Sequence, residues 1–78
     1  MSMDILKEIA GSGKAWAAER AIYAIQITEA AHAGDISMGE YRELMQDLVR
    51  MDRLDAEADD MAMKAALVSA VYVVANLA

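Results

Sequence analysis

The 78-residue chain contains no cysteine and no proline. Without cysteine it can form neither a disulfide nor a thiolate metal site. A chain of this length makes one domain at most and buries only about 60–65% of its unfolded surface, so it needs a further source of stability. Small folds commonly obtain this from disulfides, metals or oligomerisation. We therefore expect the chain to associate with copies of itself.

Basic residues are also few, because seven Lys and Arg stand against thirteen Asp and Glu, for a net charge of −6. This charge repels phosphate backbones and predicts no nucleic-acid partner. The N-terminus lacks the basic and apolar regions of a secretory signal. The longest apolar run, residues 65–78, is shorter than the roughly 20 residues that span a bilayer. We expect no membrane partner and a cytoplasmic protein, or one within a virion if a phage encodes it.

Apolar residues make up 58% of the sequence, and they recur at helical spacing along most of it. The spacing predicts an all-α fold, either a small helical bundle or a long helical hairpin, completed by homo-oligomerisation. The single domain covers residues 1–78, with helices over about 3–10, 14–33, 38–55 and 60–77.

The last two predicted helices leave an alternative open, because the apolar spacing from residue 41 onward never breaks helical phase. One interpretation is a continuous helix of about forty residues. The other is a turn within residues 52–60, with Asp55 or Asp59 as the N-cap of the last helix. The average length of helices in globular proteins favours the turn.

The chain has four glycines, and the last of them is Gly39. The segment from Gly34 to Glu40 predicts a chain reversal. Gly34 stands where a helix C′ glycine belongs. Ser37 and Glu40 form a capping box, with the serine as N-cap and the glutamate at N3, so that each side chain accepts from a backbone N–H. Ile36 and Tyr41 can form the accompanying hydrophobic staple.

The C-terminal segment has few polar residues, since only Lys64, Ser69 and Asn76 are strongly polar between residues 61 and 78. A helix that is apolar all round is buried all round. One short chain supplies too few partner helices for this, so the segment predicts an oligomer interface. The predicted interface residues are Ala62, Ala66, Val68, Ala70, Val71, Tyr72, Val74 and Ala75.

Four acidic residues form the one motif with a chemical interpretation. Glu40 and Glu43 make an E-x-x-E step, and Glu57 and Asp60 make an E-x-x-D step after a gap. The pattern resembles that of the all-α NTP pyrophosphatases. The resemblance implies that these carboxylates hold magnesium against a triphosphate. Glu40 would then serve both the metal and the capping box.

Other catalytic patterns are missing, because the lone His32 is accompanied by no nucleophile-elbow sequence. We expect a non-enzymatic protein–protein interaction or assembly module with no catalytic residue, cofactor or metal. Such a small acidic accessory protein resembles phage structural components or inhibitors of host proteins in size and style. Its expected partners are itself and another protein. The alternative is the magnesium-dependent pyrophosphatase.

Overall fold

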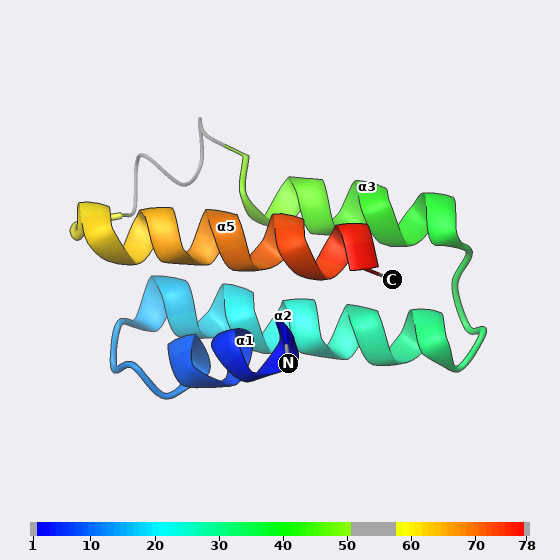
Figure 1. The fold of residues 1–78 in the computed structure, drawn as a ribbon, viewed down its shortest axis with the longest axis horizontal. Helices are drawn as coiled ribbons and strands as arrows, with labels where there is room; N and C mark the ends of the chain where they lie inside the picture. Colours follow the sequence, from blue (N-terminus) through cyan, green and yellow to red (C-terminus); the bar gives the residue numbers. More distant parts are fainter. Residues whose placement is uncertain (1, 51–57, 78) are drawn as a thin grey trace.

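The structure is a computed structural model that describes residues 2–50 and 58–77. These residues form four helices and no strand: α1 (Ser2–Ala10), α2 (Ala15–His32), α3 (Met38–Leu48) and α5 (Met61–Leu77). The predicted all-α class and the bundle architecture are confirmed (Figure 1).

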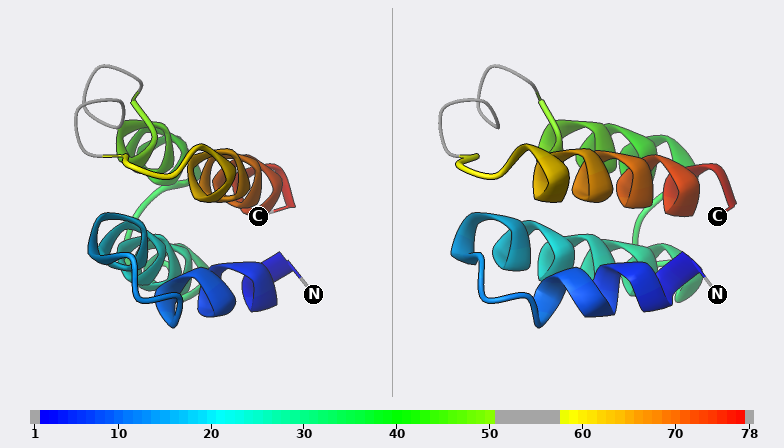
Figure 2. Two further views of the ribbon diagram at one scale, coloured as in Figure 1. Left: turned by 90° about the vertical axis from the view of Figure 1, so that its left-hand side faces the viewer. Right: turned by 60° about the vertical axis from the view of Figure 1, so that its left-hand side comes forward.

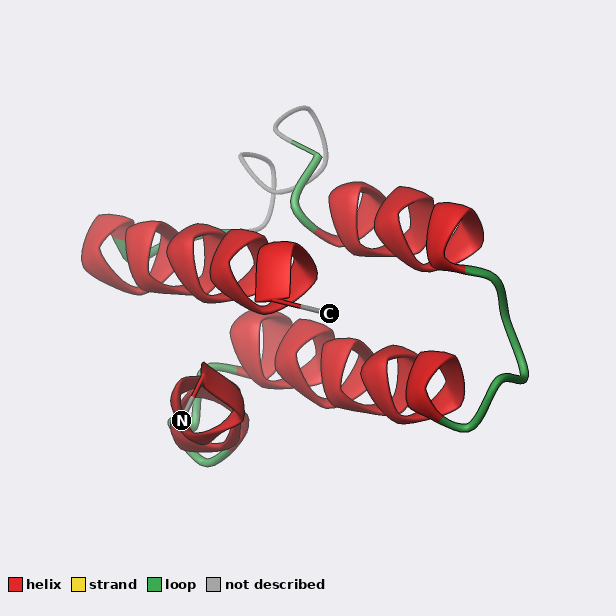
Figure 3. Cartoon of the chain, turned by 45° about the vertical axis from the view of Figure 1, so that its right-hand side comes forward, coloured by secondary structure: helices red, strands yellow, loops and turns green. Residues whose placement is uncertain are grey.

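The helices form two layers, with α1 and α2 in one and α3 and α5 in the other (Figure 1). Helices α2, α3 and α5 alternate in direction along the bundle (Figure 1). Seen from the end in Figure 2, α5 lies between α1 and α3, and it also contacts α2 across the centre. Figure 3 shows α1 almost end-on while the other helices run across the view, so α1 crosses the bundle obliquely. One side of α5 is therefore covered by all three other helices.

The core is a single cluster of apolar side chains from all four helices. Helix α2 contributes Ala17, Ala21 and Ala24 at helical spacing, and these small residues allow neighbouring helices to approach closely. Larger side chains from the other helices fill the remaining space. The buried cluster comprises Leu6, Ile9, Ala17, Ala21, Ala24, Ile27, Tyr41, Met45, Val49, Leu67, Ala70, Val71 and Val74.

Helix α3 ends at Leu48, so the predicted extent of 38–55 is wrong at its C-terminal end. Its C-cap, Val49, leaves the helical region with φ −116° and ψ 25°. The guanidinium Nε of Arg20 donates to the Leu48 carbonyl at 3.0 Å and satisfies one of the acceptors that a helix end leaves open. A continuous helix over 38–78 is therefore also wrong. Most of the predicted turn, with Asp55, lies outside the described residues.

Helix α5 is capped by Asp60. Its carboxylate accepts from the Met63 N–H at 3.1 Å, and its carbonyl accepts the first helical bond, from the Lys64 N–H, at 2.9 Å. The prediction that Asp59 caps this helix is wrong, since Asp59 bonds to other groups. The two adjacent acids have different structural roles.

The predicted C′ glycine is confirmed at the end of α2. Gly34 adopts φ +82°, a conformation that residues with a Cβ rarely take. The Gly34 N–H donates to the Ala31 carbonyl at 3.1 Å, and the Asp35 N–H donates to the Ala30 carbonyl at 2.9 Å. This pair of bonds is the Schellman motif.

Ser37 is the N-cap of α3, as predicted. Its hydroxyl oxygen accepts from the Glu40 N–H at 3.1 Å. The reciprocal bond differs from the expected one, because the Glu40 carboxylate accepts from the Ser37 hydroxyl at 3.3 Å and not from the Ser37 backbone. The serine therefore both accepts and donates within one cap.

Replacing Ser37 with alanine removes this cap. We expect Ser37→Ala to lower the free energy of unfolding by about 1 kcal/mol, which corresponds to a fall in Tm of about 4–8 °C for a domain of this size. Urea and thermal denaturation followed by circular dichroism measure the change. Ser37→Asp keeps an acceptor at the cap and serves as the control. Equal stability of Ser37→Ala and the wild type would contradict the role of the cap.

Candidate interaction surface

The exposed side of α5 is the candidate functional surface. Leu67, Ala70, Val71 and Val74 on its inner side are almost completely buried. A helix advances about 100° per residue, which places the exposed residues on one continuous opposite face. We call this the outer face of α5: Met61, Ala62, Ala65, Ala66, Ser69, Tyr72, Val73 and Asn76.

The outer face of α5 carries no Asp, Glu, Lys, Arg or His. Its most exposed apolar side chains are Met61 at 72%, Tyr72 at 50% and Val73 at 44%. Among the four described helices, only α5 has such a face. The exposed ionisable residues of the others are Asp4, Lys7 and Glu8 on α1, Glu19, Tyr23, Glu29 and His32 on α2, and Glu40, Arg42, Glu43 and Asp47 on α3.

A buried pair of hydroxyl groups lies against the inner side of α5. Tyr41 of α3 is completely buried, and its hydroxyl lies 3.0 Å from the Thr28 hydroxyl of α2 and 3.5 Å from the Val74 carbonyl of α5. The Thr28 hydroxyl donates to the Ala24 carbonyl at 2.8 Å, so the Tyr41 proton remains for Thr28 or Val74. Turning α5 about its axis would move Val74 away from the Tyr41 hydroxyl.

The beginning of α5 is tied to the beginning of α2. The indole N–H of Trp16 donates to the Asp59 carboxylate at 2.9 Å, and the Lys14 ammonium lies 3.7 Å from the same oxygen. The hydrogen bond from Trp16, together with the charge of Lys14, holds the pKa of the Asp59 carboxyl below its ordinary value. Asp59 thus positions the segment from which α5 starts.

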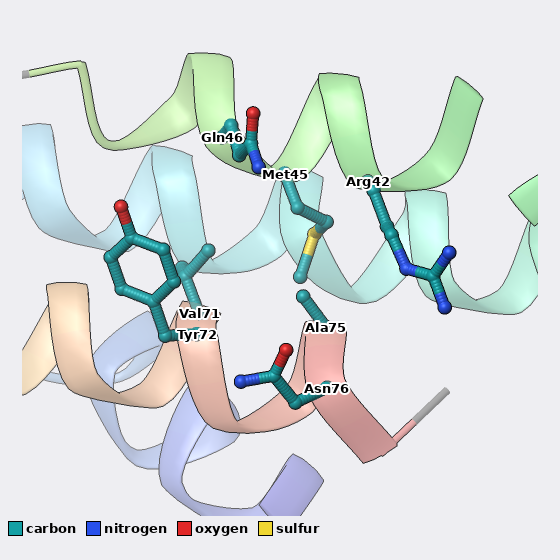
Figure 4. Close-up of a pocket in the computed structure, with 7 residues that line it drawn as sticks. All are labelled: Arg42, Met45, Gln46, Val71, Tyr72, Ala75 and Asn76. Atoms are coloured by element: carbon teal, nitrogen blue, oxygen red, sulfur yellow. The ribbon is translucent and has the colours of Figure 1, made fainter. Parts of the chain in front are cut away.

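A shallow depression of about 100 Å³ lies at the junction of α3 and α5 (Figure 4). Ligand pockets usually measure about 300–1,000 Å³, so this depression is too small to enclose a nucleotide. Tyr72 and Asn76 of the outer face line it from α5. Its other lining residues are Arg42, Met45, Gln46, Val71 and Ala75.

The predicted interface residues divide into three groups. Ala62, Ala66 and Tyr72 are exposed on the outer face, and Val68 and Ala75 are half-buried at its edge. Ala70, Val71 and Val74 are only 2%, 1% and 4% exposed and belong to the core of the single chain. These three core residues have too little exposed area to contact a further chain. Five residues of the outer face are not among the predicted interface residues: Met61, Ala65, Ser69, Val73 and Asn76.

The acidic motif is spread along the bundle. Glu40 and Glu43 lie in the first half of α3, whereas Asp60 directly precedes α5. Because α3 and α5 run antiparallel, they begin at opposite ends of the bundle (Figure 1). Glu57 lies outside the described residues. Across residues 2–50 and 58–77, no group of three or more His, Asp or Glu side chains is arranged to hold a metal.

No protein-family model matches the chain, and no curated protein or solved structure is detectably similar to it. Within the described part of the chain, no helix has the length and apolarity needed to cross a membrane.

Proposed function

We propose that the protein is a non-enzymatic assembly module that associates with a second copy of itself through the outer face of α5. The observation that carries this proposal is the absence of charged side chains from that face. Charged residues are depleted from the buried centres of protein interfaces, whereas ordinary solvent-facing helices carry them. The outer faces of α1, α2 and α3 follow the ordinary pattern.

The side chains of the outer face also suit helix–helix packing. Ala62, Ala65, Ala66 and Ser69 are small, and the distance between two packed helices depends on the side chains at the contact. Tyr72 adds an amphipathic ring of the kind that is enriched at interfaces. Association would remove Val73 and the two most exposed large apolar side chains of the described residues, Met61 and Tyr72, from water.

The interface is small. Helix α5 has 17 residues and is about 25 Å long, and a single helix presents a contact strip about 10 Å wide. Two such strips amount to about 500 Å² together, less than the roughly 1,200–2,000 Å² that stable specific complexes bury. We therefore expect a reversible dimer. The acidic faces of α1, α2 and α3 remain available in it for a further protein with a basic surface.

The mass of the protein in solution tests the proposal. We expect sedimentation equilibrium to give twice the chain mass as the concentration rises from the micromolar to the millimolar range. Added salt should preserve or strengthen the dimer, because it screens the repulsion between two chains of charge −6. A monomer mass over the whole concentration range would overturn the proposal.

A further inference from the structure

The two halves of the outer face of α5 differ in the size of their side chains. The N-terminal half presents Ala62, Ala65 and Ala66, with Met61 at its outer end. The C-terminal half presents Tyr72, Val73 and Asn76. Ser69 lies midway between the halves. Between Ala62 and Asn76 the side chains are small before Ser69 and larger after it, so this part of the face is complementary to its own reversed copy.

We propose that two copies of α5 pack antiparallel, with the two-fold axis of the dimer passing beside Ser69. This proposal rests on the proposed function and specifies its geometry. Two residues then face each other when they lie equally far from Ser69 in the sequence, one before it and one after it. Ala62 of one copy meets Asn76 of the other, Ala65 meets Val73, and Ala66 meets Tyr72. In each of these three pairs an alanine packs against a larger side chain, and the serines at the axis allow close approach.

The position of the axis follows from the extent of the outer face. The face runs from Met61 to Asn76, and Ser69 lies at its centre. An axis at Ser69 covers the face of both copies along its whole length. Moving the axis toward either end leaves part of both faces in water and reduces the apolar area that association buries.

A parallel arrangement fits the same face poorly. It would place Tyr72 and Val73 of the two copies against each other and would leave the alanines of the other half apart. Side chains separated by a gap lose their dispersion contacts. A parallel pair also aligns the two helix dipoles with like ends together, whereas an antiparallel pair places opposite ends together. Symmetric association through one patch on both copies yields a closed dimer.

Single cysteines test the arrangement directly, because the chain has none of its own. In the antiparallel dimer two copies of Ser69→Cys lie beside each other at the axis. In Ala62→Cys, the two thiol-bearing positions lie seven residues from the axis in opposite directions. They are therefore separated by about 21 Å along the helices. A disulfide requires Cα atoms within about 7 Å. The control is Gln26→Cys, which places the thiol on the exposed face of α2.

Mild oxidation followed by non-reducing electrophoresis gives the result. We expect a gain of cross-linked dimer over the control for Ser69→Cys and for a mixture of Ala62→Cys with Asn76→Cys. We expect no gain for Ala62→Cys alone or for Asn76→Cys alone.

The other outcomes separate the two proposals. A dimer mass with cross-linking of Ala62→Cys and of Asn76→Cys to themselves would overturn the antiparallel arrangement and leave the α5 interface intact. A dimer mass with no gain for Ser69→Cys and none for the mixture would overturn the position of the axis. A monomer mass, with every variant at the level of the control, would overturn both the arrangement and the self-association.

Discussion

Replacing Val73 with glutamate should leave the chain folded and convert the dimer to a monomer. Val73 is 44% exposed in the single chain, so a glutamate there reaches water without disturbing the core. In the dimer the same carboxylate would lie beside Ala65 of the other copy, where the outer face holds no lysine or arginine and Lys64 is half-buried at its edge. Burying an unpaired charge costs roughly 3–5 kcal/mol, and the symmetry places two such charges in one interface. We expect association to weaken at least about a hundredfold.

A matched control separates this effect from a general effect of added charge. Ile22 on α2 is 46% exposed, close to the exposure of Val73, and its helix face already carries acidic residues. Ile22→Glu adds the same charge at another place and should keep both the fold and the dimer. Sedimentation equilibrium gives the mass, and circular dichroism reports the helix content. Retention of the dimer by Val73→Glu, or its loss in Ile22→Glu, would place the interface away from α5.

The parts of the fold that the sequence predicted well depend on local chemistry. The Schellman turn at Gly34 needs a residue that tolerates positive φ, and the cap at Ser37 needs a short side chain with an oxygen acceptor. Both requirements can be recognised within a few residues. The starts and ends of α1 and α2 agree with the prediction to within one residue, because breaks in the apolar spacing mark them.

The end of α3 could not be predicted in this way. The helix stops at Leu48, yet Val49 remains in the core at 4% exposure. The apolar spacing therefore continues through the point at which the helix ends. The group that satisfies the Leu48 carbonyl is Arg20, which lies 28 positions earlier on α2. A contact at such a distance in the sequence leaves no local pattern.

The candidate site was predicted in part for a related physical reason. Helix α5 has apolar residues on all sides. Their spacing therefore identifies a buried helix but does not show which side of it faces the core of the chain. The direction comes from contacts with the other helices, which bury Leu67, Ala70, Val71 and Val74 and place the Val74 carbonyl beside the Tyr41 hydroxyl. For this reason the predicted interface combined surface residues such as Ala66 with core residues such as Val74. The scarcity of charge on α5 was visible in the sequence, and it is the property on which the proposed function rests.

Replacing Val71 with aspartate should unfold the chain itself. Val71 is two positions before Val73 on the same helix, but it is only 1% exposed and belongs to the core that α5 shares with the other helices. An aspartate there buries a charge inside the single chain at a cost of roughly 3–5 kcal/mol. Domains of this length have a total stability of about 4–12 kcal/mol, so the change removes a large part of it.

Urea denaturation at a concentration where the wild type is monomeric measures the loss without a contribution from association. Val73→Asp is the control, because it introduces the same group on the outer face of the same helix and should unfold close to the wild-type midpoint. A wild-type midpoint for Val71→Asp would mean that the inner side of α5 does not pack in the core as the structure places it. Loss of stability in Val71→Asp alone, with loss of the dimer in Val73→Asp, would separate the two sides of α5: the inner side stabilises one chain, and the outer side joins two.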